Sequence, residues 1–128
     1  MTAKEIINKA IILLGYNDIN GNTGDARLQS ASLGAVNAVY SDLYYLNKKT
    51  GFETISDAEQ VIDLDERTLN DVMPYGVAAY IAQSIGDTDS QQFFAIIYNQ
   101  KRKTVTTKNA IQDTLPAVRS RNQKSSYR

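Results

Sequence analysis

The stretch at residues 69–87, LNDVMPYGVAAYIAQSIGD, decides the fold. Its apolar residues recur at the spacing of one helical face, at Leu69, Val72, Met73, Val77, Ala78, Ile81 and Ile85. Asp65 precedes the stretch as a helix-capping residue, and Gly86 is a natural helix stop. We therefore predict a helix over about residues 66–85.

Pro74 lies inside this helical pattern. Proline has no backbone N–H and clashes with the carbonyl four residues earlier, so we predict a kink or break near residues 70–74. Gly76 follows directly, and its missing side chain adds local freedom or lets another element pack closely against the helix.

Three further segments show the helical period. Thr2 and Glu5 match a capping box, which predicts a first helix over about residues 3–14. A longer second helix is predicted to run to about residue 47. After the Asp87-Thr88-Asp89 turn, a fourth helix is predicted over about residues 90–104.

Two loops separate these helices. Residues 15–25 are rich in glycine, asparagine and aspartate, which is loop composition, and Asp25 can cap the second helix. A calcium loop is the alternative there, but the spacing of an EF-hand and its closing glutamate are missing. Residues 50–63 form the other loop, and a short extended piece at 59–64 is too short to support a sheet.

The helical pattern fades after Thr104, where β-branched residues are followed by Pro116. The last residues have too few large apolar groups to fold alone. We predict a helical bundle domain at residues 1–107 and an extended C-terminal arm at residues 108–128, which becomes ordered on a partner. The predicted fold class is all-α: a small bundle of four main helices with extended loops and this C-terminal arm.

The composition argues against catalysis. The chain contains no cysteine and no histidine, which removes thiolate zinc sites, cysteine nucleophiles and the commonest general base. Its paired carboxylates directly precede predicted helices, where capping explains them. We expect no enzyme, no cofactor and no metal. No stretch approaches a membrane span and no signal peptide is evident, so we expect the chain in the cytoplasm of the cell that makes it.

Charge is distributed unevenly along the chain. Residues 1–100 carry six Lys/Arg and thirteen Asp/Glu, a net charge of −7, whereas residues 101–128 carry eight Lys/Arg and one Asp, a net charge of +7. Such a division indicates a basic tail that contacts something negative, although a solvated tail would have the same composition. Lys101, Arg102 and Lys103 fall at the expected end of the fourth helix, where the helix dipole favours cations.

Tyrosines are concentrated in the second and third predicted helices. Tyrosine suits contacts that have one apolar and one wet side, and core packing and stacking on a nucleobase are the alternatives. We predict a subunit interface that includes Tyr40, Tyr44, Tyr45, Tyr75 and Tyr80.

Residues 69–87, followed by Phe93-Phe94 and by IYNQKR at residues 97–102, resemble the head-to-tail connector proteins (adaptor or head completion proteins) of tailed phages. In that family a helix of the PYGVAAYIA type, a Gly-Asp turn and a helix ending in YNxKR follow one another in this order. The resemblance covers residues 1–104 in pattern and is specific over residues 69–102.

The resemblance implies a structural virion protein rather than an enzyme. Such connectors are helical bundles that assemble as a ring, commonly of twelve copies, beneath the portal protein. They extend the DNA channel and dock a stopper or tail completion protein. The chain would then be made in the host cytoplasm and reside in the virion neck. The resemblance also implies transient, non-specific contact with DNA in the channel. The charges that would make this contact, or would lie at a protein interface instead, are Lys101, Arg102, Lys103 and Lys108.

In the family, the C-terminal segment reaches out to grip the portal. By position and composition, this implies a portal-binding arm that includes Leu115, Pro116, Val118, Arg119, Arg121, Lys124, Tyr127 and Arg128. The alternatives are a small nucleic-acid-binding protein that uses the basic tail, and another helical interaction module such as a regulator or chaperone. Tight binding to duplex DNA would favour the first, and a monomer with a different soluble partner would favour the second.

Overall fold

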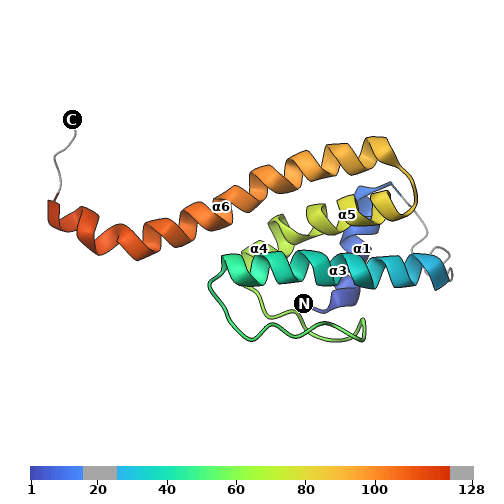
Figure 1. Cartoon of the computed structure of the whole chain (residues 1–128), viewed down its shortest axis with the longest axis horizontal. Helices are drawn as coiled ribbons and strands as arrows, with labels where there is room; N and C mark the ends of the chain where they lie inside the picture. The colour runs from blue at the N-terminus through green and yellow to red at the C-terminus, as the bar shows by residue number, and fades with distance from the viewer. Residues whose placement is uncertain (16–25, 122–128) are drawn as a thin grey trace.

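The structure, a computed structural model, describes the backbone of residues 1–15 and 26–121 and the side chains of residues 1–15 and 30–105. These residues form helices and no strand, which confirms the predicted all-α class (Figure 1). The helices are α1 (Ala3–Leu13), α3 (Ala26–Leu46), α4 (Glu66–Asp71), α5 (Met73–Ser84) and α6 (Thr88–Arg121).

Helix α1 begins at the predicted capping box. The Thr2 backbone N–H donates to the Glu5 carboxylate at 2.8 Å, and the Glu5 N–H donates to the Thr2 hydroxyl at 3.3 Å. Carbonyls of the α3–α4 loop satisfy two more N–H groups of the first turn, which Ala3 and Lys4 donate to Gln60 and Ala58. The first turn of α1 is therefore fixed both by its own sequence and by a loop far along the chain.

The predicted third helix is broken where Pro74 indicated. Helix α4 ends at Asp71, and α5 begins at Met73 after Val72, whose φ is −115°. Pro74 therefore occupies the first turn of α5, where its missing N–H leaves no intrahelical hydrogen bond unmade. Asp65 caps α4 as predicted, accepting from the Thr68 N–H at 3.2 Å.

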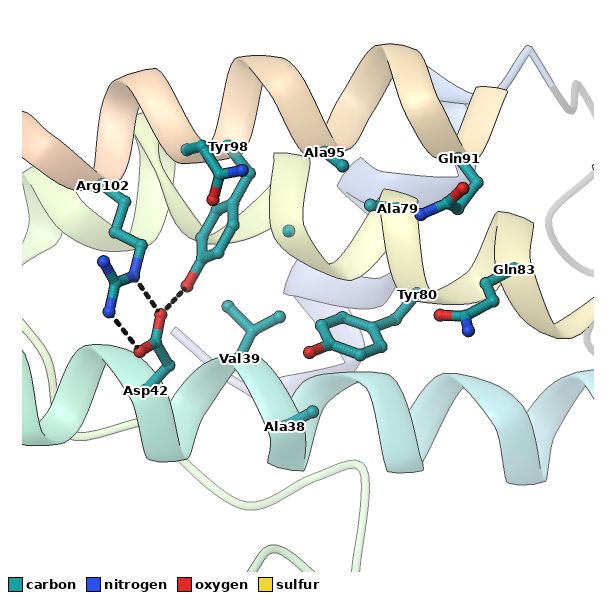
Figure 2. A pocket seen from close by; sticks show the side chains of 12 residues that line it. Ala38, Val39, Asp42, Ala79, Tyr80, Gln83, Gln91, Ala95, Tyr98 and Arg102 are labelled. Atoms are coloured by element: carbon teal, nitrogen blue, oxygen red, sulfur yellow. Dashed lines mark hydrogen bonds and ion pairs between the residues drawn. The ribbon is translucent and has the colours of Figure 1, made fainter. Parts of the chain in front are cut away.

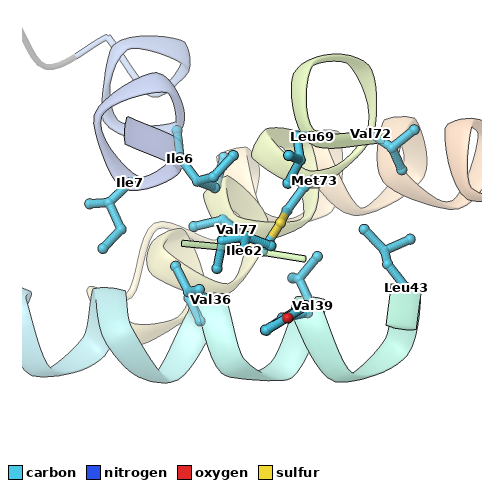
Figure 3. Close-up of a cluster of buried hydrophobic side chains, with 14 of the residues drawn as sticks. Ile6, Ile7, Val36, Val39, Leu43, Ile62, Leu69, Val72, Met73 and Val77 are labelled. Atoms are coloured by element: carbon cyan, nitrogen blue, oxygen red, sulfur yellow. The ribbon is translucent and has the colours of Figure 1, made fainter. Parts of the chain in front are cut away.

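Helix α5 is the centre of the bundle, with α3, α6 and α1 packed around it (Figure 1). Its apolar side chains meet those of α1, α3, α4 and the loop residue Ile62 (Figure 3). Most of α5 is buried: Met73, Pro74, Gly76, Val77, Ala78, Ala79, Ile81 and Ala82. Helix α5, which lies within the stretch at residues 69–87, is thus the central element of the hydrophobic core.

Helix α6 corrects the prediction for the end of the chain. It begins as expected, with Asp87 accepting from the Ser90 N–H at 3.1 Å, but it runs to Arg121 rather than ending near residue 104. Residues 108–121 are therefore helical, not extended, and no backbone break separates the predicted bundle from the predicted arm. Extending an existing helix costs little free energy, and the threonines after residue 103 disfavour the helix by only a few tenths of a kcal/mol each.

Several predicted features lie outside the described residues. These are the calcium-loop alternative, the cap at Asp25, and the arm residues Lys124, Tyr127 and Arg128. For the arm positions on α6 (Leu115, Pro116, Val118, Arg119 and Arg121) only the helical backbone is described. Among the described helices, none is long and apolar enough to cross a membrane.

Candidate functional site

A groove of about 390 Å³ lies between α3, α5 and α6 (Figure 2). Its apolar wall consists of small side chains, Ala38 from α3, Ala79 from α5 and Ala95 from α6. These alanines line the space where α3 and α6 each pack against α5 but contact each other little. The sequence alone did not indicate a groove here.

A polar cluster forms one end of the groove. The Asp42 carboxylate of α3 accepts from Arg102 Nε at 2.6 Å and from Arg102 Nη2 at 2.8 Å, and the Tyr98 hydroxyl donates to the same carboxylate at 2.6 Å (Figure 2). Tyr98 and Arg102 are four residues apart on α6, so both reach α3 from one helical face. The paired geometry of the two Arg102 contacts makes this the most specific polar link between α3 and α6.

The cluster shifts the titration of its members. The hydrogen bonds from Arg102 hold the pKa of the Asp42 carboxyl below its ordinary value, because they favour the charged form. Burial, together with the hydrogen bond to Asp42, raises the pKa of the Tyr98 hydroxyl above its ordinary value. At neutral pH the carboxylate is therefore charged and the phenol neutral.

Gly76 on α5 makes this arrangement possible. A Cβ at this position would lie 2.8 Å from Cδ1 and Cε1 of the Tyr98 ring and 3.0 Å from Val39 Cγ2. Such distances are shorter than van der Waals contact, so only glycine lets the ring lie against α5. The glycine and the tyrosine of the stretch 69–102 are thus packing partners.

Replacing Asp42 with asparagine tests the cluster through its pH dependence. Because the pKa of Asp42 is lowered in the folded chain, its stabilisation is complete above the ordinary carboxyl pKa of about 3.9 and is lost as the pH falls through the folded value. Side chains of the pair are about one third exposed, so we expect Asp42→Asn to cost only about 1–2 kcal/mol at pH 7.

The measurement is the free energy of unfolding by urea at pH 7 and at steps down to pH 2. The difference between Asp42→Asn and the original chain should shrink toward zero at the acid end. Glu53→Gln, at an exposed loop position, is the matched control and should change stability little at pH 7. A cost for Asp42→Asn that stays constant with pH would show that the Asp42 charge does not stabilise the fold.

The rim of the groove carries neutral polar groups. Gln83 of α5 and Gln91 of α6 supply amides, and the exposed Tyr80 supplies a phenol (Figure 2). Asn99 of α6 also lines the groove and adds an amide. No group of three or more carboxylate, histidine or cysteine side chains suited to a metal ion occurs within the described part of the chain. The groove is therefore equipped to hold an uncharged insert with hydrogen-bonding edges.

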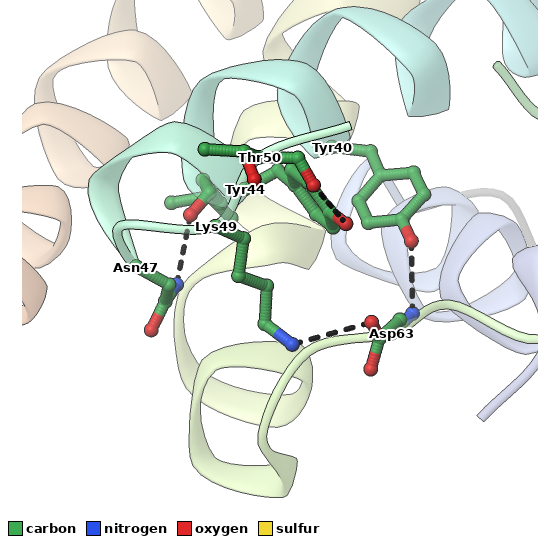
Figure 4. A network of polar contacts seen from close by, with 7 residues as sticks. Tyr40, Tyr44, Asn47, Lys49, Thr50 and Asp63 are labelled. Atoms are coloured by element: carbon green, nitrogen blue, oxygen red, sulfur yellow. Dashed lines mark hydrogen bonds and ion pairs between the residues drawn. The ribbon is translucent and has the colours of Figure 1, made fainter. Parts of the chain in front are cut away.

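The structure places one predicted interface tyrosine in the core of its own chain. Tyr40 is 6% exposed, and its hydroxyl accepts from the Asp63 N–H at 3.0 Å (Figure 4). Its ring meets the rings of Tyr44 and Phe52 edge-on. Tyr40 therefore packs within its own chain, and little of its side chain is left for a contact with another subunit. Core packing is one of the alternatives that the sequence leaves open for these tyrosines.

The other four tyrosines are at least partly accessible. Tyr45 and Tyr80 are exposed, whereas Tyr44 and Tyr75 are half-buried. They do not form one surface, because Tyr44 and Tyr45 contact Phe52 near the end of α3, whereas Tyr75 contacts Phe94 on α6. Tyr44 and Tyr45 therefore lie in one place and Tyr75 in another, and a subunit interface through these tyrosines stays a prediction.

The basic triplet lies in the middle of α6, not at its end, so the helix dipole does not explain it. Arg102 is held by Asp42, and the Lys101 ammonium lies 4.8 Å from the centre of the Tyr75 ring. Lys103 is exposed, and Lys108 lies beyond the described side chains. Two of the four predicted channel or interface charges therefore contact their own chain.

Sequence reasoning missed Asp42 and Tyr98 as a linked pair. The available signals were a single carboxylate in the 21-residue α3 and the i, i+4 spacing of Tyr98 and Arg102. Neither signal identifies the partner, since Asp42 and Tyr98 are 56 residues apart in the sequence.

Comparison with known protein families, with curated proteins and with solved structures found no match to this chain.

Proposed function

We propose that this chain is a head-to-tail connector of a tailed phage. Its copies form a ring, of twelve by the family pattern, beneath the portal protein in the virion neck. The ring extends the DNA channel and docks a stopper or tail completion protein. In this function the chain is a structural subunit and DNA contact is transient and non-specific.

The stretch that resembles the connector family supports this proposal. It forms α5 and the first part of α6, and its residues Gly76, Tyr98 and Arg102 join three helices through one close packing and one polar cluster. The resemblance is therefore carried in part by residues with specific structural roles.

The observation that carries the proposal is the length of α6. Val105 is buried against the bundle, yet the helix continues to Arg121 and extends beyond the other helices (Figure 1). An isolated helical extension of this length is marginal in water without packing. Its Lys108, Arg119 and Arg121 outnumber Asp113, so a partner with an acidic, partly apolar surface fits it. We assign that partner as the portal.

Duplex DNA is the competing partner for the same basic segment. Arg102 already pairs with Asp42 and Lys101 with the Tyr75 ring, which leaves fewer cations for phosphates. The acidic body, with seven carboxylates between residues 53 and 71 against one arginine, also disfavours a DNA-coating role. These features favour a protein partner.

Two binding measurements on the full chain test the proposal. The chain should co-migrate with the assembled portal protein of the same phage genome in a density gradient. It should bind a short duplex only weakly at physiological salt. Tight, steeply salt-dependent duplex binding without any portal association would contradict the connector function and favour the nucleic-acid alternative.

A further inference from the structure

Among the described side chains of α6, apolar residues lie on two sides of the helix, and the bundle buries one of these sides. Phe94, Tyr98 and Val105 are buried against the other helices. Phe93 and Ile96 are 59% and 60% exposed, and with Ile97, which packs partly against the core, they form an exposed apolar ridge on the helix. A fold needs only the first side, so the ridge calls for a second explanation.

The ridge and the groove lie on opposite flanks of the same helix. Consecutive residues of an α-helix are about 100° apart, so residues two positions apart point about 200° apart. Phe93 is two positions from both Gln91 and Ala95, which line the groove, and Ile97 is two positions from Ala95 and Asn99. One copy therefore presents a ridge on one side of α6 and a groove on the other.

We infer that the ridge of one copy inserts into the groove of the next copy of this chain. This inference rests on the proposed ring and names the contact that builds it. Contact between two different surfaces of identical chains is head-to-tail, and repeated copies close into a ring when the rotation allows. The inference therefore identifies the ring neighbour as the occupant of the groove.

The chemistry of the two surfaces is complementary. The alanine wall of the groove accepts apolar side chains, and its volume of about 390 Å³ accommodates an aromatic and an aliphatic side chain together. Glutamines flank both surfaces, Gln92 and Gln100 beside the ridge and Gln83 and Gln91 at the rim of the groove, so amide hydrogen bonds can surround the apolar contact. At one end of the groove the charges of Asp42 and Arg102 neutralise each other.

The test uses two variants that each destroy one surface. The ridge variant is Phe93→Gln with Ile96→Gln, and the groove variant is Ala38→Phe, whose ring would fill the space. Val61→Gln is the matched control, because Val61 is 67% exposed in the loop before α4, away from both surfaces. Circular dichroism and thermal unfolding check that every variant remains folded.

Sedimentation velocity should show self-association of the original chain and of Val61→Gln. Each of the two variants alone should associate at least about tenfold more weakly. Mixed together, they should form a heterodimer and stop there, because one intact ridge then meets one intact groove. Monomeric behaviour of the original chain at its highest soluble concentration would overturn the inference, as would association of folded ridge variants at full strength.

Single cysteines give a second readout, since the chain contains none. A mixture of Ile96→Cys and Gln83→Cys chains should form a disulfide-linked heterodimer under mild oxidation, at a yield well above that of Ile96→Cys mixed with Val61→Cys. Equal yields would overturn the inference.

If rings still form on the portal with the ridge removed, the ridge contact is wrong and the connector function stands. If the two variants associate when mixed but the chain does not bind the portal, the ridge contact stands and the connector function is wrong.

Discussion

Replacing Gly76 with alanine will destabilise the fold by about 1–3 kcal/mol, the usual cost of overpacking a tight core contact. The added Cβ meets two ring carbons of Tyr98 at 2.8 Å, and the ring cannot swing away without breaking its hydrogen bond to Asp42. Val39 on α3 blocks the other side at 3.0 Å. The gain in helix propensity from alanine, about 1 kcal/mol, offsets only part of this cost.

Gly34→Ala is the matched control for this prediction. Gly34 is also a helical glycine, in α3, but it is exposed and a Cβ there meets nothing within 4 Å. Only the propensity gain remains, so we expect Gly34→Ala to stabilise the chain by about 0.5–1 kcal/mol. Urea denaturation of both variants measures the two effects. Equal stabilities for Gly76→Ala and Gly34→Ala would show that the contact between α5 and α6 is not close.

Removing residues 115–128 will abolish portal binding and leave the bundle folded. The described contacts of α6 with the bundle reach Val105, so the midpoint of thermal unfolding should change little. The removed segment contains four of the eight basic residues found after residue 100, together with Leu115 and Val118. If it is the portal-binding arm, its loss removes both the charge and the apolar part of that contact.

A full-length chain with Arg119→Gln and Arg121→Gln separates these two contributions. We expect this variant to keep portal binding at low salt but to lose affinity, because the apolar residues remain while the electrostatic attraction falls. Binding to the portal is measured by co-migration in a density gradient. A truncated chain that binds the portal as well as the full chain does would rule out the arm as the portal contact.

The features that the sequence predicted correctly are local. Capping by Thr2, Asp65 and Asp87 depends on residues within three positions, and the break at Pro74 follows from one missing N–H and one ring. Each of these is decided before any tertiary contact forms, which is why a single sequence indicates them.

The features that the sequence did not predict depend on distant partners. The contacts of Asp42 with Tyr98 and Arg102 join positions 56 and 60 apart, and the groove exists only because three helices converge with alanines between them. The prediction of where α6 ends was wrong for another reason. Threonines disfavour helix locally, but a helix that is already nucleated at Asp87 propagates through them at small cost.

Electron microscopy of the chain mixed with the assembled portal protein of its phage tests the connector function most directly. Negatively stained particles should show a ring added to one end of the portal, coaxial with its channel, and class averages should give the number of copies. Portals that remain bare at an excess of the folded, full-length chain would contradict the connector function, because a connector must assemble on the portal that it extends.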